Sequence, residues 1–476
     1  MKNNTIYVLN SLLILFLIST SIIGQNFYRS YGSEGNDYGQ SIELSPDSGY
    51  VVVGATEGLG AGATDGYVIK LDALGNMEWS RTYGGPNIDW ITDIKSVSDG
   101  YVMCGYSNSY SNGYNSYLLK TDFNGIIIWD TIFGGGDWDF LYSIDVNTAG
   151  NIIAAGKSYS GSYGQADGYV IEASMTGQIL DTIYMGGPYN DHINDVLCTA
   201  DGGTILTGAK SVNSNDTDIW IVKIDAAGNT MWENTLGDTL NDEAFHCLEL
   251  IPGTFLVSGV DEVSTGTYKD HVMIKMNAAG VIEIANYLNE PQDDIGIAST
   301  SYAGDSSYVT IGNTTSFYHG ETDIRTFECG FNTYGSYTFN YDFGTAEDDF
   351  ANSVDTTIDK GLVIAGTTEG TAFGFSNIFV HKVDSTLTQG TFTEDVDLSI
   401  ETSLVTTDYP FFYSSINNCI KITDMSKLSA SNYYILDLGG RILDMKTIST
   451  SEIHLDLPVG LYIFALGKQT LKFIVE

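Results

Sequence analysis

The apolar positions of this chain fall into short runs that recur with a period of about 50 residues. In every repeat an acidic residue opens one apolar run and a glycine closes the next, and successive markers lie 50 to 55 residues apart. The aspartates are Asp37, Asp89, Asp139, Asp191, Asp242, Asp294 and Asp349, and the glycines are Gly54, Gly105, Gly156, Gly208, Gly259, Gly312 and Gly366. Two markers that keep one register through seven repeats indicate an architecture of similar stacked units.

Each repeat divides into four short runs that we expect to be β-strands. In the second repeat they cover 89–97, 101–105, 117–122 and 126–133, separated by turns rich in Asp and Gly. No unit shows a 3.6-residue apolar period, which disfavours a helical solenoid. Four antiparallel strands in about 50 residues form one propeller blade, and seven blades lie within the usual range. The sequence therefore predicts an all-β fold, with a seven-bladed β-propeller over 25–390.

The segment 27–32 resembles the fourth run of a repeat, although it precedes the first repeat. Its sequence, Phe-Tyr-Arg-Ser-Tyr-Gly, matches the fourth runs of the first two repeats at 79–84 and 129–134. The seventh repeat, in turn, has no clear fourth run after Asp384. We therefore expect 27–32 to complete the last blade and to close the ring.

Acidic residues also begin the third run of several repeats, as at 65–70, 218–223 and 270–275, where a lysine ends the motif. The segment 167–172 keeps the aspartate but has Glu172 in place of the lysine. Asp side chains commonly accept backbone N–H bonds at turns and strand starts, so their recurrence favours a structural role. The alternative is that the aspartates that open the first strands gather near a channel mouth and hold a cation.

The two ends of the chain leave the repeat register. Lys2, an apolar run over 6–23 and the small residue Gly24 form the pattern of a secretory signal peptide over 1–24, and a membrane anchor is the alternative. Short alternating runs over 401–476 predict a small immunoglobulin-like β-sandwich after a linker at 391–400.

Composition narrows the range of partners. The chain has 60 acidic and 20 basic residues, a formal net charge of −40, which disfavours nucleic acid and anionic membranes and favours cations. Its 53 glycines, 31 tyrosines and 21 phenylalanines agree with strands joined by tight turns. The five cysteines are scattered and form no CxxC motif, which predicts free thiols rather than disulfides or a zinc site.

The long loops of an antiparallel blade are expected on one face of the propeller, and in this chain they are rich in aromatic residues. Loops on a rigid scaffold often carry function. Aromatic faces stack on sugars and nearby carboxylates bind hydroxyl groups, so this face is a candidate carbohydrate-binding surface; the alternative is that each tyrosine packs over its own loop. The candidate residues are Trp90, Tyr106, Tyr110, Tyr114, Asp137, Trp138, Tyr159, Tyr163, Tyr189 and Tyr318.

A second candidate site lies at 213–218, where oxygen-bearing side chains are spaced somewhat as in a calcium loop. Its ligands would be Asn213, Asn215, Asp216 and Asp218, which makes Ca²⁺ the candidate cofactor. The segment lacks the glycine and the terminal glutamate of an EF-hand.

Few features point to catalysis. The six histidines occupy unrelated repeat positions and form no HExxH or Ser/His/Asp pattern. Carboxylate pairs such as Asp293/Asp294 could serve glycoside hydrolysis, but 60 acidic residues make such pairs common. We favour a binding or adhesion protein with surface glycans or proteins as partners, and a propeller-fold glycosidase or polysaccharide lyase is the alternative.

The segment DGYVIKLDALGNMEWSRTYGG at 65–85 is representative of the repeats. In this form the repeats resemble the secreted β-propeller repeat proteins of Bacteroidota, over about residues 26–390. The resemblance implies the fold, whereas propellers host both binding and enzymatic functions.

The tail carries YYILDLGGRIL at 433–443, LPVGLYI at 457–463 and KFIV at 472–475. These motifs resemble, in order, the type A C-terminal sorting domain of the type IX secretion system, although its usual Tyr-Pro-Asn-Pro start appears only as Tyr-Pro-Phe-Phe at 409–412. The resemblance implies export across the outer membrane, a secreted or cell-surface location and the type IX secretion machinery as a partner. The motif residues are Asp437, Gly440, Arg441, Pro458, Gly460, Tyr462 and Lys472.

Overall fold

The computed structural model describes residues 26–385, apart from 111–112, 162–163, 264–267, 288–292, 303–306, 316–321, 331–336, 346 and 370–374, together with strands between 392 and 475. Throughout these described residues the regular elements are β-strands, and no helix has the length and apolar character needed to cross a bilayer. The predicted signal peptide over 1–24 lies outside the described residues.

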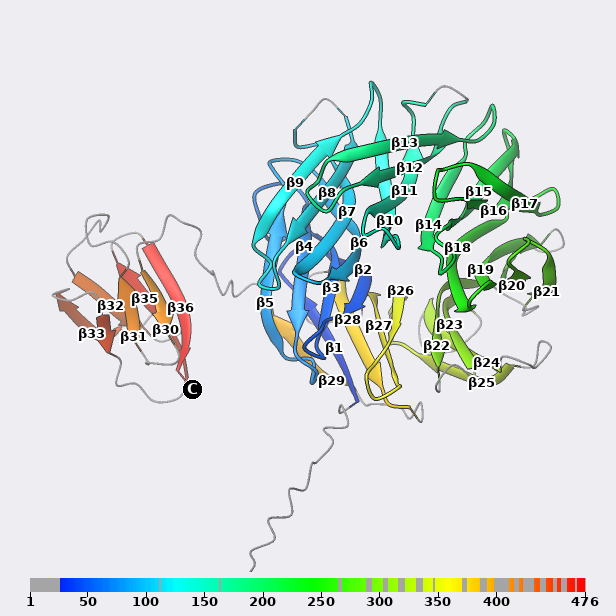
Figure 1. Cartoon of the computed structure of the whole chain (residues 1–476). Coiled ribbons are helices and arrows are strands. Elements are labelled where there is room, and N and C mark those ends of the chain that lie inside the picture. The colour runs from blue at the N-terminus through cyan, green and yellow to red at the C-terminus, as the bar shows by residue number, and fades with distance from the viewer. Residues whose placement is uncertain are drawn as a thin grey trace, which may run out of the picture.

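Seven sheets surround a central axis (Figure 1). Six of them have four antiparallel strands, which follow one another outward from the axis in sequence order, and the seventh has five strands. Blade 1 contains β2 (Asp37–Leu44), β3 (Tyr50–Thr56), β4 (Asp65–Leu71) and β5 (Met77–Tyr83). Blade 2 contains β6 (Asp89–Val97), β7 (Gly100–Ser107), β8 (Asn115–Thr121) and β9 (Ile127–Phe133), and blade 3 contains β10 (Asp139–Val146), β11 (Ile152–Ser158), β12 (Asp167–Ala173) and β13 (Ile179–Met185). The predicted seven-bladed β-propeller is confirmed.

The next three blades repeat this order. Blade 4 contains β14 (His192–Cys198), β15 (Thr204–Asn213), β16 (Asp216–Ile224) and β17 (Thr230–Leu236). Blade 5 contains β18 (Glu243–Ile251), β19 (Thr254–Val263), β20 (Tyr268–Asn277) and β21 (Ile282–Tyr287), and blade 6 contains β22 (Asp294–Tyr302), β23 (Ser307–Thr314), β24 (Asp323–Gly330) and β25 (Tyr337–Phe343).

Blade 7 combines the two ends of the repeat region. Strands β26 (Asp349–Thr356), β27 (Leu362–Thr368) and β28 (Asn377–Val383) are followed in space by β1 (Phe27–Gly32), which pairs antiparallel with β28. This pairing confirms that the N-terminal strand closes the ring. A fifth strand, β29 (Phe392–Asp397), lies within the predicted linker at 391–400 and pairs parallel with β1.

The apolar cores lie between neighbouring blades, because the second and third strands, as in blades 1 and 7, are buried on both faces. Tyr28 of β1 packs with residues of blades 6 and 7, whereas Phe27 and Tyr31 pack with residues of blades 1 and 7. The closing strand thus contributes to two cores on opposite faces of one sheet.

The aspartate that opens each blade ties two loops together. In blade 2, Asp89 Oδ2 accepts hydrogen bonds from the Gly85 N–H at 2.8 Å and the Ser109 hydroxyl at 2.6 Å. Asp139 accepts the equivalent bonds in blade 3 from Gly135 and Ser160. These contacts join the loop before the blade to the loop after its second strand, which supports the structural interpretation of the repeated aspartates.

A buried lysine in the third strand explains most of the repeated Asp-Gly-Tyr-Val-Ile-Lys motif. Lys70 Nζ lies 2.7 Å from Asp47 in the turn between the first two strands. In blade 3, which lacks the lysine, Glu172 accepts hydrogen bonds from Asn147 and Asn151 of the same turn. The motif therefore fixes a turn in each of these blades. The equivalent pairs are Lys120–Asp99, Lys223–Asp201 and Lys382–Asp359.

Tyrosines of two outer strands join blade 7 to blade 1 and blade 1 to blade 2 through buried hydrogen bonds. The Tyr31 hydroxyl donates to the Gly75 carbonyl at 2.6 Å, and the Tyr83 hydroxyl donates to the Gly125 carbonyl at 2.7 Å. Gly75 and Gly125 both have positive φ, near +78° and +73°, as the tight turns between the third and fourth strands require.

We expect Tyr83→Phe to lower the free energy of unfolding by about 1 kcal/mol, because the Gly125 carbonyl loses a buried partner. Tyr110→Phe is the matched control. The Tyr110 hydroxyl donates to the Gly84 carbonyl, but the Tyr110 side chain is exposed, so water can replace the lost hydrogen bond. Urea unfolding of both variants measures the difference. Equal losses would contradict a role for the buried latch.

The tail residues form two sheets of short strands. One contains β30 (Phe411–Ser414), β31 (Cys419–Ile422) and β34 (Glu452–His454), and the other contains β33 (Ile442–Thr447), β32 (Asn432–Leu436), β35 (Gly460–Leu466) and β36 (Gln469–Val475). Their packing as an immunoglobulin-like sandwich stays a prediction. Among the sorting-motif residues, Gly460 and Tyr462 lie on β35 and Lys472 on β36, whereas the other four lie outside the described residues: Asp437, Gly440, Arg441 and Pro458.

Candidate functional site

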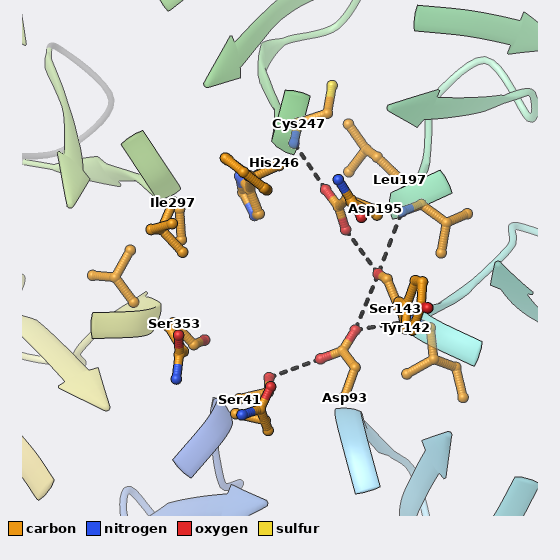
Figure 2. Close-up of a pocket in the computed structure, with 18 of the residues that line it drawn as sticks. Ser41, Asp93, Tyr142, Ser143, Asp195, Leu197, His246, Cys247, Ile297 and Ser353 are labelled. Atoms are coloured by element: carbon orange, nitrogen blue, oxygen red, sulfur yellow. Dashed lines mark hydrogen bonds between the residues drawn. The ribbon is translucent and has the colours of Figure 1, made fainter. Parts of the chain in front are cut away.

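A cavity of about 520 Å³ runs along the propeller axis and is lined by the innermost strand of every blade (Figure 2). Each of these strands has a β-bulge at the same place, three residues after its opening aspartate. A bulge re-aims the side chains that follow it. As a result, three tiers of equivalent positions can be followed around the axis.

The middle tier is formed by the residue that follows each bulge. The Ser41 hydroxyl donates to Asp93 Oδ1 at 2.7 Å, and the Ser143 hydroxyl lies between Asp93 Oδ2 at 3.1 Å and Asp195 Oδ1 at 2.7 Å (Figure 2). The Cys247 N–H donates to the other oxygen of Asp195 at 2.8 Å. These bonds connect blades 1 to 5 in an arc around the cavity. The remaining members of the tier are His246, Ala298 and Ser353.

The inner tier lies two residues further along each strand and contains Glu43, Asp145 and Asp355 together with Lys95. Burial raises the pKa of Glu43 to about 7, with the neighbouring Asp355 and Asp93 adding to the rise and Lys95 opposing it. Lys95 Nζ lies 3.8 Å from Glu43, and burial also raises the pKa values of Asp145 and Asp355. Each of these aspartates accepts backbone N–H bonds, Asp145 from Cys198 and Asp355 from Leu44, so the tier joins neighbouring blades.

The outer tier lies at the mouth of the channel, next to the opening aspartates. Tyr38 and Trp90 stack with ring centroids 5.2 Å apart, and Trp90 stacks on Tyr106, the residue opposite it on β7. Tyr106 meets Phe140 edge to face at 5.1 Å, and Phe140 stacks on Tyr142. Aromatic contact therefore continues across blades 1, 2 and 3.

Loop residues extend this surface outward. Tyr114 lies 5.3 Å from Phe140 and 5.7 Å from Trp138, measured between ring centroids, and Trp138 contacts Tyr159 at 6.3 Å. Trp138 is 49% exposed, so its ring is available to a ligand. We call this continuous surface the aromatic arc: Tyr38, Trp90, Tyr106, Tyr114, Trp138, Phe140, Tyr142 and Tyr159.

Five of the ten residues predicted from the loops meet in the aromatic arc: Trp90, Tyr106, Tyr114, Trp138 and Tyr159. Asp137 is exposed and caps the Trp138 N–H at 2.9 Å, which places it at the edge of the arc. The exposed Tyr110 lies against the preceding loop through its bond to Gly84, and the half-buried Tyr189 accepts a bond from Gln165 N–H through its carbonyl. Tyr163 and Tyr318 lie outside the described residues.

Sequence reasoning missed Tyr38, Phe140 and Tyr142, and also a polar continuation of the mouth. His192 and Glu243 occupy the positions equivalent to Tyr38 and Trp90, directly after the opening aspartates of blades 4 and 5. Their side chains are 2.6 Å apart, from His192 Nε2 to Glu243 Oε1. Comparing the residue after the opening aspartate in all seven repeats would have revealed this tier.

The predicted calcium segment forms the tight turn between β15 and β16. Asn213 pairs with Asp216 across the turn, its Nδ2 donating to Asp216 Oδ2 at 3.0 Å, while its Oδ1 accepts the Asn215 N–H. Two of the four candidate ligands therefore bind each other, and calcium at this turn stays a prediction. In the described part of the chain, no group of three or more His, Cys, Asp and Glu side chains is arranged to hold a metal ion.

No protein-family model and no curated protein matches this chain. Among solved structures, it is similar to the Pan2 WD40 domain of Neurospora crassa, at 9% identity and a TM-score of 0.47, over 76% of this chain and 92% of that one. It is also similar to the periplasmic gluconolactonase PpgL of Pseudomonas aeruginosa, at 9% identity and a TM-score of 0.47, over 70% of this chain and 99% of that one.

A third similar structure is PorZ of Porphyromonas gingivalis, described as an essential bacterial surface component of the type IX secretion system. The identity is 12% and the TM-score 0.44, over 91% of this chain and 59% of that one.

Proposed function

We propose that this protein is a non-enzymatic carbohydrate-binding propeller and that the aromatic arc is its binding site. The observation that carries the proposal is the continuous contact of eight aromatic side chains from three blades at one mouth of the channel. Aromatic side chains used only as core are buried between sheets, whereas this group includes the half-exposed Trp138. Flat aromatic faces with hydroxyl groups at their edges suit pyranose rings, which have both C–H faces and hydroxyls.

Fixed polar groups at the edge of the arc supply directional contacts. Asp137 is exposed beside Trp138, and the Tyr38 hydroxyl lies 3.4 Å from Glu57 Oε1. A small number of placed polar groups in an otherwise apolar site usually sets ligand orientation.

A glycosidase or polysaccharide lyase is the second candidate, and one observation favours it. The cavity below the arc contains Glu43, whose pKa burial raises to about 7, with Lys95 and other carboxylates nearby. A carboxyl group that keeps its proton near neutral pH can act as a general acid. Against this, Asp93 and Asp195 are committed to hydrogen bonds that join blades, which leaves less freedom for proton transfer.

We propose further that the protein is exported by the type IX secretion system to the cell surface or the medium. The signal-peptide pattern over 1–24 and the three ordered motifs of the tail support this proposal. The type IX secretion machinery would then be one partner, and surface glycans or proteins would be the others.

Binding of a glycan panel to the full chain tests the proposed site. We expect Trp138→Ala to weaken binding of any retained glycan about tenfold, because an exposed aromatic ring that stacks on a sugar carries much of the binding energy. Tyr287→Ala is the matched control, since Tyr287 is an exposed aromatic residue on the outer strand of blade 5, and it should leave binding unchanged.

Three results would count against the proposal. Unchanged binding in Trp138→Ala, or an equal loss in Tyr287→Ala, would place the site elsewhere. Release of shortened sugars from the panel would favour the glycosidase or lyase instead.

A further inference from the structure

Resting on the proposed carbohydrate site, we infer that His192 and Glu243 form its polar half and that the sugar it selects bears a free ammonium group. The aromatic arc covers the mouth on blades 1 to 3, and this pair continues the same tier on blades 4 and 5. The inference concerns which carbohydrates bind, and it can fail while the site itself stands.

The two halves of the mouth are adjacent. Tyr142 stacks on Phe140 at the end of the arc, and burial, followed by the neighbouring Tyr159 and Glu243, raises the pKa of Tyr142 to about 12. Tyr142 and Asn194 are the bulge residues of the innermost strands of blades 3 and 4 and both line the cavity, and the Asn194 amide donates to Glu243 Oε1. A ligand that stacks on the arc would meet Glu243 at its edge.

Glu243 is held in one orientation. Oε1 accepts the Asn194 amide at 2.7 Å and lies 2.6 Å from His192 Nε2, while Asn194 also donates to the Ala244 carbonyl at 2.9 Å. Among the described residues, no hydrogen bond is made to Oε2. The side chain is 29% exposed, so this oxygen remains as an acceptor for a ligand.

The surroundings keep Glu243 charged. Burial alone would raise its pKa, but the hydrogen bonds from His192 and Asn194 and the positive charge of Lys269 lower it further than burial raises it. A carboxylate beside an aromatic surface suits a cation, because ion pairing and the negative faces of the rings act together.

The cavity below the mouth is negatively charged, as is the Glu243 carboxylate. Asp93, Asp145, Asp195 and Asp355 line it, and Lys95 is the one lysine or arginine among the described lining residues. The field of these groups disfavours uronic acids and other anionic sugars. Among carbohydrates, the arrangement therefore selects amino sugars whose nitrogen is not acetylated.

Isothermal titration of the full chain with a glucosamine tetramer and with its fully N-acetylated counterpart tests this selectivity. At about pH 6, below the ordinary pKa of an amine, we expect the glucosamine tetramer to bind at least tenfold more tightly. Glu243→Gln keeps the size and the Oε1 acceptor, and it should remove this preference by weakening the glucosamine tetramer far more than the acetylated one, with the melting temperature unchanged. Glu283→Gln, the same charge change on the outer strand of blade 5, should retain the preference.

Each other outcome overturns a defined part of the inference. Equal binding of the two tetramers, or a preference that survives Glu243→Gln, would remove the ammonium selectivity and leave the carbohydrate site intact. A tri-lysine peptide that binds as tightly as the glucosamine tetramer would show that the site recognises the cation without the sugar. If Glu243→Gln lowers the melting temperature and weakens both tetramers alike, the pair is structural and the inference is wrong.

Discussion

Deletion of residues 26–32 is expected to abolish the cooperative unfolding transition of the propeller. The missing residues include all of β1, which pairs antiparallel with β28 and parallel with β29 and so occupies the interior of the blade 7 sheet. Without it, β28 has an unpaired edge, and the cores shared with blades 1 and 6 lose Phe27, Tyr28 and Tyr31. A ring of blades is stabilised by its closure, so opening one blade weakens contacts on both sides.

Point variants separate this closure from a general effect of truncation. Tyr31→Ala removes a fully buried ring and its bond to Gly75, and should lower the free energy of unfolding by about 3 to 5 kcal/mol. Arg29→Ala, on the same strand, removes an exposed bond to Asn76 and should cost less than about 1 kcal/mol. Differential scanning calorimetry measures both. An unchanged melting profile for the truncated chain would refute closure by β1.

The architecture was predictable because each repeat contains the same pattern of short apolar runs, an opening acidic residue and a closing glycine. The four strands expected in the second repeat differ from β6 to β9 by at most two residues at any end. Tight turns fix those ends, as at Gly75 and Gly125, where a positive φ favours glycine. The strand β29 was not predicted, since it pairs with a segment more than 350 residues away and its own sequence shows no repeat register.

The candidate site was predictable only in part. Aromatic residues in long loops were visible in the sequence, and Trp138 and Tyr159 indeed meet. Tyr38 and Phe140 were read as strand residues, because a linear pattern does not show that the first strand of a propeller faces an open channel. His192 and Glu243 are 51 residues apart and lie on two different blades. Their contact depends on how the blades are arranged around the propeller axis, which no local motif encodes.

Raising the pH from 4.5 to 8 is expected to destabilise the propeller by about 3 kcal/mol through Glu43 alone. In the unfolded chain Glu43 has the ordinary pKa of 4.5. In the folded chain its pKa rises to about 7, because burial and the neighbouring Asp355 and Asp93 disfavour the charge more than Lys95 favours it. Between these values the folded state holds a proton that the unfolded state has released, so stability is complete below pH 4.5 and falls as pH rises through 7.

Urea unfolding at pH 5 and pH 8 measures this dependence, and two variants locate it. Glu43→Gln should flatten most of the slope, since its amide stays neutral and can still accept the Ser96 N–H that Glu43 binds at 3.1 Å. Glu369→Gln removes an exposed carboxylate and should leave the slope as it is. Asp93, Asp145 and Asp355 carry pKa values raised by burial and act in the same direction, so a residual slope in Glu43→Gln is expected from them. A chain equally stable at both pH values would show that water or bound cations in the channel already neutralise its acidic lining, and that Glu43 titrates as it does in the unfolded state.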